Sequence, residues 1–335
     1  MNPNLKQAYK AAADFFRAGD NFLLLVHEKP DGDAFGSILG TAHLLQQLGK
    51  TFTLVNDDPV PNKFQFFPLA DRFRLPEDVE GTFDWVIAQD CGDRKRLGRS
   101  GEKLIADDAK ILNIDHHKTN DFFGTENLVD LDAAATCQII YKVAKELEMT
   151  LSLDTATCLY TGLVTDTGGF RYSNTTEEVM LIGADLLRHG VQPYNIIDKV
   201  METLTWPQVQ LIREALSGIE RDETGRIAWI KVSRDVLERV QAEDEDVEGL
   251  INYPRNVQGV EVGVSFRDAA PGKVKVSFRS KYLVDVGAIA VEFGGGGHAR
   301  AAGCTVEGTI EEIEPRVIDR IKQALQEVDV AEPTA

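Results

Sequence analysis

The stretch NFLLLVHEKPDGDAFGS, residues 21–37, joins a run of apolar side chains to a histidine and two aspartates. The uninterrupted run 22–26 predicts a strand buried on both faces, which is typical of a parallel sheet covered by helices. The run ends at His27, and Asp31 and Asp33 follow with a single glycine between them. One imidazole and two carboxylates where a buried strand reaches the surface indicate a site for binding or catalysis.

The first half of the chain repeats this alternation of buried strand and helix. Further apolar runs predict strands at 51–56, 84–90 and 109–115. Helical periodicity predicts helices at 35–49, 135–148 and 154–166. Continuous apolar strands that alternate with helices predict an α/β domain built on a parallel sheet, with helices on both faces.

The pattern changes in the second half of the chain. Helical signals from 175 to 218 are interrupted by Pro193 and Pro207, and strand patterns begin at about residue 219. Strands are expected at 226–233, 259–268 and 273–280, and helices at 285–293 and 310–328. We therefore expect a parallel-sheet domain over 1–190, a helical connector over 191–218 and a smaller α/β domain over 219–330.

Charge and hydropathy narrow the class of protein. The 335 residues carry a net charge of −18, which argues against a protein that coats long nucleic acid. The window from Ile251 to Gly303 differs, because its seven Lys or Arg and four Asp or Glu give a local charge of +3. A small basic region in an acidic protein favours a small anionic ligand. No apolar run reaches transmembrane length and the start lacks a signal-peptide pattern, so no membrane association is expected.

The cysteines are scattered and form no C-x-x-C pair. They are Cys91, Cys137, Cys158 and Cys304. Disulfides and a structural zinc site are therefore not expected, and a reducing cytoplasm is the predicted location.

Three predicted strands end at ionisable residues. These residues are His27, Asp90 and the sequence Asp115-His116-His117. Ligands of open α/β sheets bind outside the carboxyl ends of the strands, so we expect these side chains to meet at one edge with Asp31 and Asp33. Asp166, at the end of the predicted helix 154–166, could join them.

Each aspartate taken alone is explained by the preference of Asp for turns and helix caps. As a set, so many carboxylates at one edge would repel each other, and a multivalent cation relieves that repulsion. Mixed carboxylate and imidazole ligands suit Mn²⁺, Fe²⁺ or Zn²⁺. Two histidines with at least four aspartates exceed the needs of one ion, which favours two ions about 4 Å apart, the geometry used in phosphoryl hydrolysis.

Four segments around these residues resemble the motifs of the DHH phosphoesterase superfamily, which includes the RecJ exonucleases. They are HEKPDGDAFGS (27–37), AQDCGDRKRLG (88–98), NIDHHKTN (113–120) and TGLVTDTGGFRYSN (161–174). Two later segments, VKVSFRSK (274–281) and FGGGGHARAAG (293–303), resemble its DHH-associated C-terminal substrate domain. The six segments follow the family's order over nearly the whole chain, and the compact form most resembles the nano-RNase/pAp-phosphatase branch.

The resemblance implies a dinuclear site in a catalytic domain, usually with Mn²⁺. The implied ligands are His27 and Asp31 for the first ion, Asp33, His116 and Asp166 for the second, and Asp90 as a bridge between them. The resemblance also implies that very short oligoribonucleotides are hydrolysed to mononucleotides, and pAp (3′-phosphoadenosine 5′-phosphate) to AMP.

Three further residues acquire expected roles from this resemblance. Asp115 would orient a histidine, and His117 would contact the scissile phosphate. Gly32 would let the backbone turn tightly between the two aspartates that serve different ions.

The glycine run Gly294, Gly295, Gly296 and Gly297 permits two interpretations. It could be a flexible turn, or a phosphate-binding loop between two helical patterns, in which backbone N–H groups and His298 face an anion. The coincidence of glycines with cationic side chains favours phosphate binding. Arg279 and Ser280, at the end of a predicted strand, could grip a phosphate or a base.

Other functions on this scaffold stay open from the sequence. A phosphodiesterase for cyclic or linear dinucleotides is the nearest alternative, and a nucleotide-binding regulator with a vestigial metal site is another. A pyrophosphatase has no need for an arginine-bearing strand that could hold a base. The sequence leaves a homodimer open.

Overall fold

The computed structural model describes residues 3–247 and 249–331. Packing divides the chain into two compact units, with the boundary between Thr203 and Leu204. This boundary lies inside the expected connector over 191–218. The connector is therefore divided, with α7 (Pro193–Ile197) in the first unit and α8 (Trp206–Ser217) in the second. None of the helices formed by the described residues is long and apolar enough to cross a membrane.

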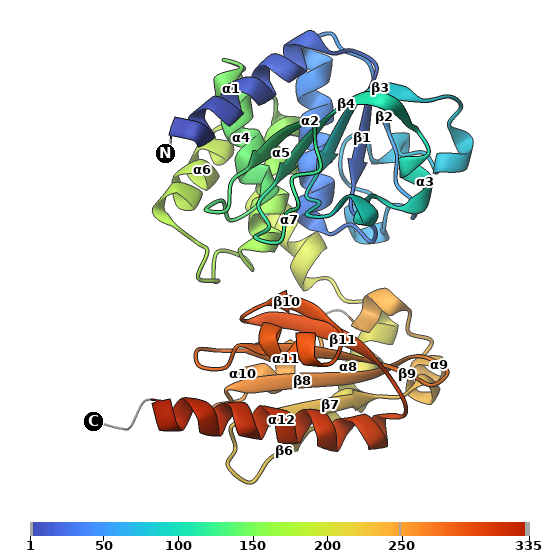
Figure 1. Ribbon diagram of the computed structural model, residues 1–335, viewed down its shortest axis with the longest axis vertical. Helices are drawn as coiled ribbons and strands as arrows, with labels where there is room; N and C mark the ends of the chain where they lie inside the picture. The colour runs from blue at the N-terminus through green and yellow to red at the C-terminus, as the bar shows by residue number, and fades with distance from the viewer. Residues whose placement is uncertain (1–2, 248, 332–335) are drawn as a thin grey trace. The chain divides into compact units, whose positions relative to one another are not determined.

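The first unit contains the predicted parallel sheet (Figure 1). Its strands, in spatial order, are β2 (Phe52–Leu54), β1 (Phe22–Val26), β3 (Phe83–Gln89), β4 (Ile105–Asp115) and β5 (Glu126–Val129). Strand β1 is buried on both faces, because Phe22 and Leu24 pack into one hydrophobic core and Leu23 and Leu25 into another. Strand β2 lies on one side of β1, and β3 and the later strands lie on the other, so the direction in which strands are added reverses at β1. Ligands of such sheets bind at this switch point, outside the carboxyl ends of β1 and β3.

The helices of the first unit pack on this sheet or on one another. Besides α7, they are α1 (Pro3–Ala18), α2 (Gly32–Gln47), α3 (Arg99–Glu102), α4 (Thr136–Glu146), α5 (Leu153–Asp166) and α6 (Glu177–Arg188). Short 3-10 turns and a π-helix (Asp198–Glu202) complete the unit.

Close packing of α2 on α5 matters most for the site. A Cβ on Gly32 would lie 2.5 Å from the Thr165 side chain, and one on Gly36 would lie 2.5 Å from the carbonyl oxygen of Cys158. The two helices therefore run antiparallel, and the start of α2 lies beside Asp166 at the end of α5. Gly32 is the first residue of α2 and has no left-handed backbone. The expected tight turn at Gly32 is thus wrong, and the glycine instead permits close helix packing.

The second unit holds a mixed sheet. Its strands, in spatial order, are β10 (Gly296–His298), β11 (Ala301–Glu307), β9 (Lys273–Ser280), β8 (Val262–Ala270), β7 (Ile227–Val232) and β6 (Glu220–Arg221). Its helices, besides α8, are α9 (Arg234–Val240), α10 (Asn252–Asn256), α11 (Val286–Glu292) and α12 (Ile310–Ala331). One sheet face packs on the stripe formed by Ile313, Val317 and Ile321 of α12.

The segment after the glycine run forms a strand, which contradicts the predicted second helical pattern. Strand β10 pairs antiparallel with β11, with Gly296 opposite Gly303 and His298 opposite Ala301. Ala302 and Cys304 alternate into the core of the second unit, a period of two that belongs to a strand. Because the side chains of this segment are small, the alternation cannot be recognised from the hydrophobicity of the sequence.

Candidate metal centre

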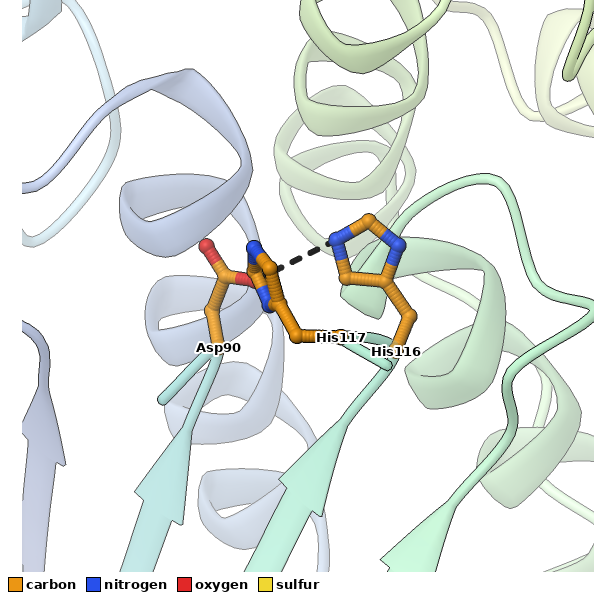
Figure 2. A group of neighbouring side chains, drawn as sticks. All are labelled: Asp90, His116 and His117. Carbon is orange, nitrogen blue, oxygen red and sulfur yellow. Dashed lines mark ion pairs between the residues drawn. The ribbon is translucent and has the colours of Figure 1, made fainter. Parts of the chain in front are cut away.

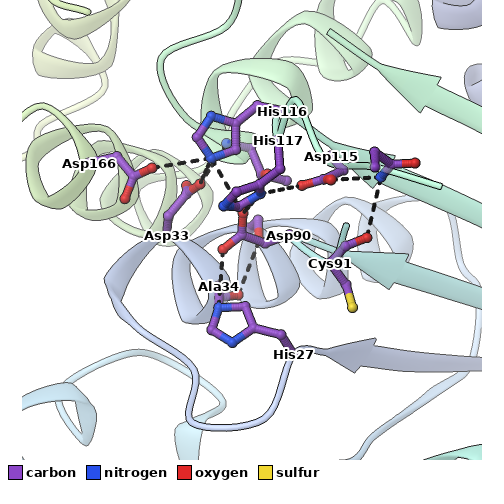
Figure 3. Close-up of polar contacts among 12 residues, drawn as sticks. His27, Asp33, Ala34, Asp90, Cys91, Asp115, His116, His117 and Asp166 are labelled. Carbon is purple, nitrogen blue, oxygen red and sulfur yellow. Dashed lines mark hydrogen bonds and ion pairs between the residues drawn. The ribbon is translucent and has the colours of Figure 1, made fainter. Parts of the chain in front are cut away.

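The carboxyl edge of the parallel sheet brings together all site residues predicted in the first domain, and Figure 3 labels each of them except Asp31. His27 follows β1, Asp90 follows β3, Asp115 ends β4 with His116 and His117 next, Asp31 and Asp33 open α2, and Asp166 ends α5. The sheet therefore supplies the histidines and the central aspartate, and the α2–α5 pair supplies the remaining carboxylates.

The first group consists of His27, Asp31 and Asp90, whose ligand atoms lie within 4.8 Å of one another. Nε2 of His27 is 3.5 Å from Oδ2 of Asp90. Nδ1 of His27 donates to the carbonyl oxygen of Glu28 at 2.8 Å, so the neutral ring presents its lone pair at Nε2. Oδ1 of Asp31 accepts two backbone N–H groups in the first turn of α2, which fixes the direction of that carboxylate.

The second group consists of Asp33, His116 and Asp166. Nε2 of His116 lies 3.3 Å from Oδ2 of Asp166 and 4.0 Å from Oδ2 of Asp33. Nδ1 of His116 donates to the carbonyl oxygen of Ala133 at 3.3 Å, so the neutral ring again presents Nε2 to the carboxylates.

Asp90 belongs to both groups because its two oxygens face different histidines. Oδ2 faces His27, and Oδ1 lies 3.6 Å from Nε2 of His116. Ligand atoms that share an ion at about 2.1 Å are separated by about 3–3.5 Å, so the separations at Asp90 suit shared ions. Asp90 is buried and has a φ of +52°, a left-handed backbone that is uncommon for residues other than glycine. Such strain concentrates at functional sites.

The crowding of charges shifts several pKa values. Burial, together with the charge of Asp90, raises the pKa of Asp33 to about 7. Burial of its carboxyl group, together with the charge of Asp33, raises the pKa of Asp166 well above its ordinary value. Although burial acts to raise it, hydrogen bonding and ion pairing with His27 and His116 lower the pKa of Asp90. Carboxyl groups with raised pKa values retain protons near neutral pH, and a bound cation would displace those protons.

His117 is held in a different way from the other two histidines. Its Nδ1 lies 2.7 Å from Oδ1 of Asp115, whose Oδ2 accepts from the Asn120 amide at 2.6 Å. Although burial acts to lower it, the hydrogen bond to Asp115 and the charge of Asp90 raise the pKa of His117 to about 9, so the ring is cationic at neutral pH.

His117 also forms a third candidate group with Asp90 and His116 (Figure 2). Nδ1 of His117 lies 3.7 Å from Oδ1 of Asp90, but this nitrogen is already bonded to Asp115. A cationic imidazole with one nitrogen committed in this way suits a contact to an anion better than a bond to a metal ion.

Three polar residues at the site were not predicted from the sequence. The Thr136 hydroxyl donates to Oδ1 of Asp90 at 3.0 Å, and the amide of Asn174 donates to the backbone carbonyl of the last residue of α5 at 3.1 Å. The third is Asn120, whose amide donates a hydrogen bond to Asp115, the residue that also contacts His117. Asn120 and Asn174 close two of the quoted motifs, which is the signal that could have found them. Thr136 has only its place at the start of a helix.

The candidates in the second unit divide into two kinds. Strand register places His298, Ala301 and Arg279 opposite one another across β10, β11 and β9, so their side chains share one face of the sheet. Ser280 is buried, and its hydroxyl donates to the carbonyl oxygen of Ala299 at 3.2 Å. Ser280 therefore supports the strand end in this structure, and a role in binding stays a prediction.

The glycine run has a structural use of its own. Gly294 and Gly297 have φ values of +77° and +139°, which side-chain-bearing residues rarely adopt. A Cβ on Gly297 would also lie 2.6 Å from the carbonyl oxygen of Ala301. The backbone thus requires glycine at these positions. The premise of a loop before a helix is wrong because a strand follows, and phosphate binding by the run stays a prediction.

A parallel α/β unit with aspartates and histidines gathered at its strand ends has groups of side chains that could hold metal ions at that edge. A family model described as the DHH family, N-terminal domain, matches residues 21–163, and one described as the DHHA1 domain matches residues 229–327. The chain belongs to the DHH family.

Two of the curated relatives match this chain over most of their own length. The chain is 31% identical to the bifunctional oligoribonuclease and PAP phosphatase NrnA of Thermus thermophilus, over 96% of each chain. It is 26% identical to the protein of the same name from Bacillus subtilis, over 86% of this chain and 90% of that one. A solved structure of an exopolyphosphatase-related protein from Bacteroides fragilis superposes with a TM-score of 0.87 at 25% identity, over 96% of each chain.

Proposed function

We propose that the protein is a metal-dependent phosphoesterase that hydrolyses short oligoribonucleotides to mononucleotides and pAp to AMP. The observation that carries this proposal is Asp90, whose two oxygens face separate histidine–aspartate groups at the switch point of a parallel sheet. The substrate class is supported by the relatives, which are named as oligoribonucleases and PAP phosphatases.

The donor set suits two divalent ions. His27 and Asp31 would hold one ion, Asp33, His116 and Asp166 would hold the other, and Asp90 would bind both. Both histidine Nε2 atoms face carboxylates while their Nδ1 atoms bond backbone carbonyls, the usual arrangement around a ligating imidazole. The mixture of imidazole and carboxylate suits Mn²⁺, Fe²⁺ or Zn²⁺, and we propose Mn²⁺ because the family resemblance implies it. When bound, the two ions would make a water molecule acidic and offset the charge of the phosphoryl group.

The chain's own residues would then orient the phosphoester and move protons. His117, cationic and held by Asp115, would donate a hydrogen bond to an oxygen of the scissile phosphate as negative charge accumulates there. Because Asp115 is also anchored by Asn120, the imidazolium does not need to reorganise during the reaction.

The second unit supports a preference for short, anionic substrates. Arg279 and His298 share a sheet face within the window of local charge +3, and we propose that they bind a substrate phosphate. The rest of the chain is strongly acidic and would repel a long polyanion. A cytoplasmic location, where such substrates arise, belongs to this proposal and rests on the free cysteines.

A substrate panel with Mn²⁺ tests the proposal. Initial rates would be measured on pAp, on RNAs from two to twenty nucleotides and on cyclic di-AMP. We expect AMP from pAp and mononucleotides from the shortest RNAs. Hydrolysis of cyclic di-AMP alone would instead assign the chain to the dinucleotide phosphodiesterases, and no hydrolysis of any member would indicate a binding protein.

A further inference from the structure

The start of α4 contacts the candidate metal centre through one side chain and two backbone groups. The hydroxyl of Thr136, which is buried, donates to Oδ1 of Asp90 at 3.0 Å. The backbone N–H of Thr136 donates to Oδ2 of Asp33 at 2.6 Å, and that of Cys137 to Oδ1 of Asp33 at 2.9 Å. A single helix start therefore orients two of the aspartates.

These contacts fall on one side of the centre. The hydroxyl of Thr136 reaches Oδ1 of Asp90, the oxygen that faces His116, whereas Oδ2 faces His27. The helix N–H groups reach Asp33, which belongs to the group of His116. Thr136 thus contacts Asp33, expected to bind the second ion alone, and the oxygen of the shared ligand Asp90 that faces the second ion.

A role for Thr136 in capping its own helix does not explain this contact. The residue at the N-cap position is Ala135, whose side chain makes no capping hydrogen bond, and the first N–H groups of α4 donate to the carboxylate of Asp33, so the Thr136 hydroxyl is not needed as a cap. A buried hydroxyl is satisfied by any nearby acceptor, yet the one that Thr136 meets is the carboxylate shared by both groups.

Several hydrogen bonds hold the loop before α4 in place, and they thereby fix the position of Thr136. The backbone N–H of Asp130 donates to the carbonyl of Asp115 at 3.0 Å, and Oδ2 of Asp130 accepts from the buried Tyr9 hydroxyl at 2.7 Å. The N–H of Ala134 donates to the side chain of Gln138 at 2.7 Å. Because the loop is anchored at several points, the Thr136 hydroxyl has a defined place.

We propose that Thr136 is a positioning residue that fixes the rotation of the Asp90 carboxylate and thereby strengthens the second metal position selectively. This inference rests on the proposed two-ion centre. Without the hydroxyl, the Asp90 carboxylate can rotate away from the His116 side, and the loss of such an outer contact typically weakens metal binding about 10–100-fold.

The test compares Thr136→Val, which removes the hydroxyl and preserves the shape, with Thr136→Ser, which retains a donor. Thr161→Val is the matched control, because Thr161 is also fully buried and its hydroxyl donates only to the carbonyl of Thr157 within α5, at 2.8 Å. Metal-free protein would be titrated with Mn²⁺, with bound ions followed by calorimetry and by electron paramagnetic resonance. Thermal unfolding of every variant would be recorded in parallel.

We expect Thr136→Val to bind the first ion as the wild type does and the second about 10–100-fold more weakly, with the spin-coupled signal of an ion pair appearing at higher Mn²⁺. Thr136→Ser should restore the second affinity, and Thr161→Val should match the wild type. Equal affinities in Thr136→Val and the wild type, or equal weakening of both ions, would overturn the inference. If Thr136→Val fails to fold, a Thr136→Ser variant with weakened second binding would overturn it as well. Failure of the wild type to bind two ions would instead refute the proposed function.

Discussion

The protein should bind Mn²⁺ more tightly as the pH rises from 6 to 8. The carboxyl of Asp33 has a pKa of about 7 when no cation offsets the surrounding charges. A carboxyl group must lose its proton to ligate a metal ion, so protons and metal compete for Asp33 below that pH. Because the pKa is raised, this competition persists to neutral pH instead of ending near pH 4.

The magnitude follows from the fraction of Asp33 that is ionised. With a pKa of about 7, that fraction is about one tenth at pH 6 and about nine tenths at pH 8, so this group alone changes the affinity about tenfold. The raised pKa values of Asp166 and of His27 act in the same direction, since each must also release a proton to ligate. Asp90, whose pKa is lowered, adds nothing in this range. At least a tenfold increase is therefore expected.

Calorimetric titration of metal-free protein with Mn²⁺ under anaerobic conditions measures this effect. Two buffers of different ionisation enthalpy at each pH report the protons released on binding. Asp33→Asn should flatten the pH dependence while weakening binding, whereas Asp132→Asn, a change at an exposed carboxylate in the loop before α4, should leave it intact. An affinity that stays constant or falls between pH 6 and pH 8 would refute the reasoning.

Three further predictions concern activity. Asp90→Ala should reduce turnover by at least ~1000-fold and Asp115→Ala by about 10–100-fold, because Asp90 faces both groups while Asp115 only orients His117; equal damage in steady-state assays would contradict this. His298→Ala should lower kcat/KM at least ~100-fold with unchanged metal content by elemental analysis, and loss of metal from this variant would argue for a ligand role. Efficiency on labelled RNAs should fall as length grows from two to beyond about five nucleotides, and rates that rise with length would point to a nuclease of long strands.

Four of the five strands of the first unit could be predicted, because a buried parallel strand leaves a continuous apolar run. Phe22–Val26 is such a run, and the histidine that follows it indicated which edge of the sheet holds the site. Strand β5 was not predicted, because Glu126–Val129 is short and begins with two polar residues. The gathering of strand ends follows from the topology of parallel sheets, which is why His27 and Asp90 were expected to meet. Their approach to 3.5 Å agrees with that expectation.

Other features depend on packing that one sequence does not display. Asp166 was expected at the site, but the packing of α2 on α5 that brings it there was not. Nothing in the pattern around Gly36 states which helix will pack against that glycine. Thr136 reaches Asp90 only through a loop whose path is set by distant contacts such as that of Tyr9 with Asp130. Neither contact has a local signature.

The error at the glycine run has a similar origin. Strand β11 begins with Ala301, Ala302 and Gly303, and two methyl groups and a glycine do not reveal an alternation of buried and exposed side chains. Its partner strand, β9, lies more than twenty residues away in the sequence and supplies the pairing that decides its conformation. Short-range patterns therefore suggested a helix where long-range pairing forms a strand.

The measurement that tests the central claim most directly is the rate of AMP formation from pAp as metal-free protein is titrated with Mn²⁺. The proposed centre requires both ions, so activity should be absent in excess EDTA and should rise as the second ion binds. Asp90→Ala should remain inactive throughout the titration. Full activity in excess EDTA, or full activity with one ion bound per chain, would contradict the account.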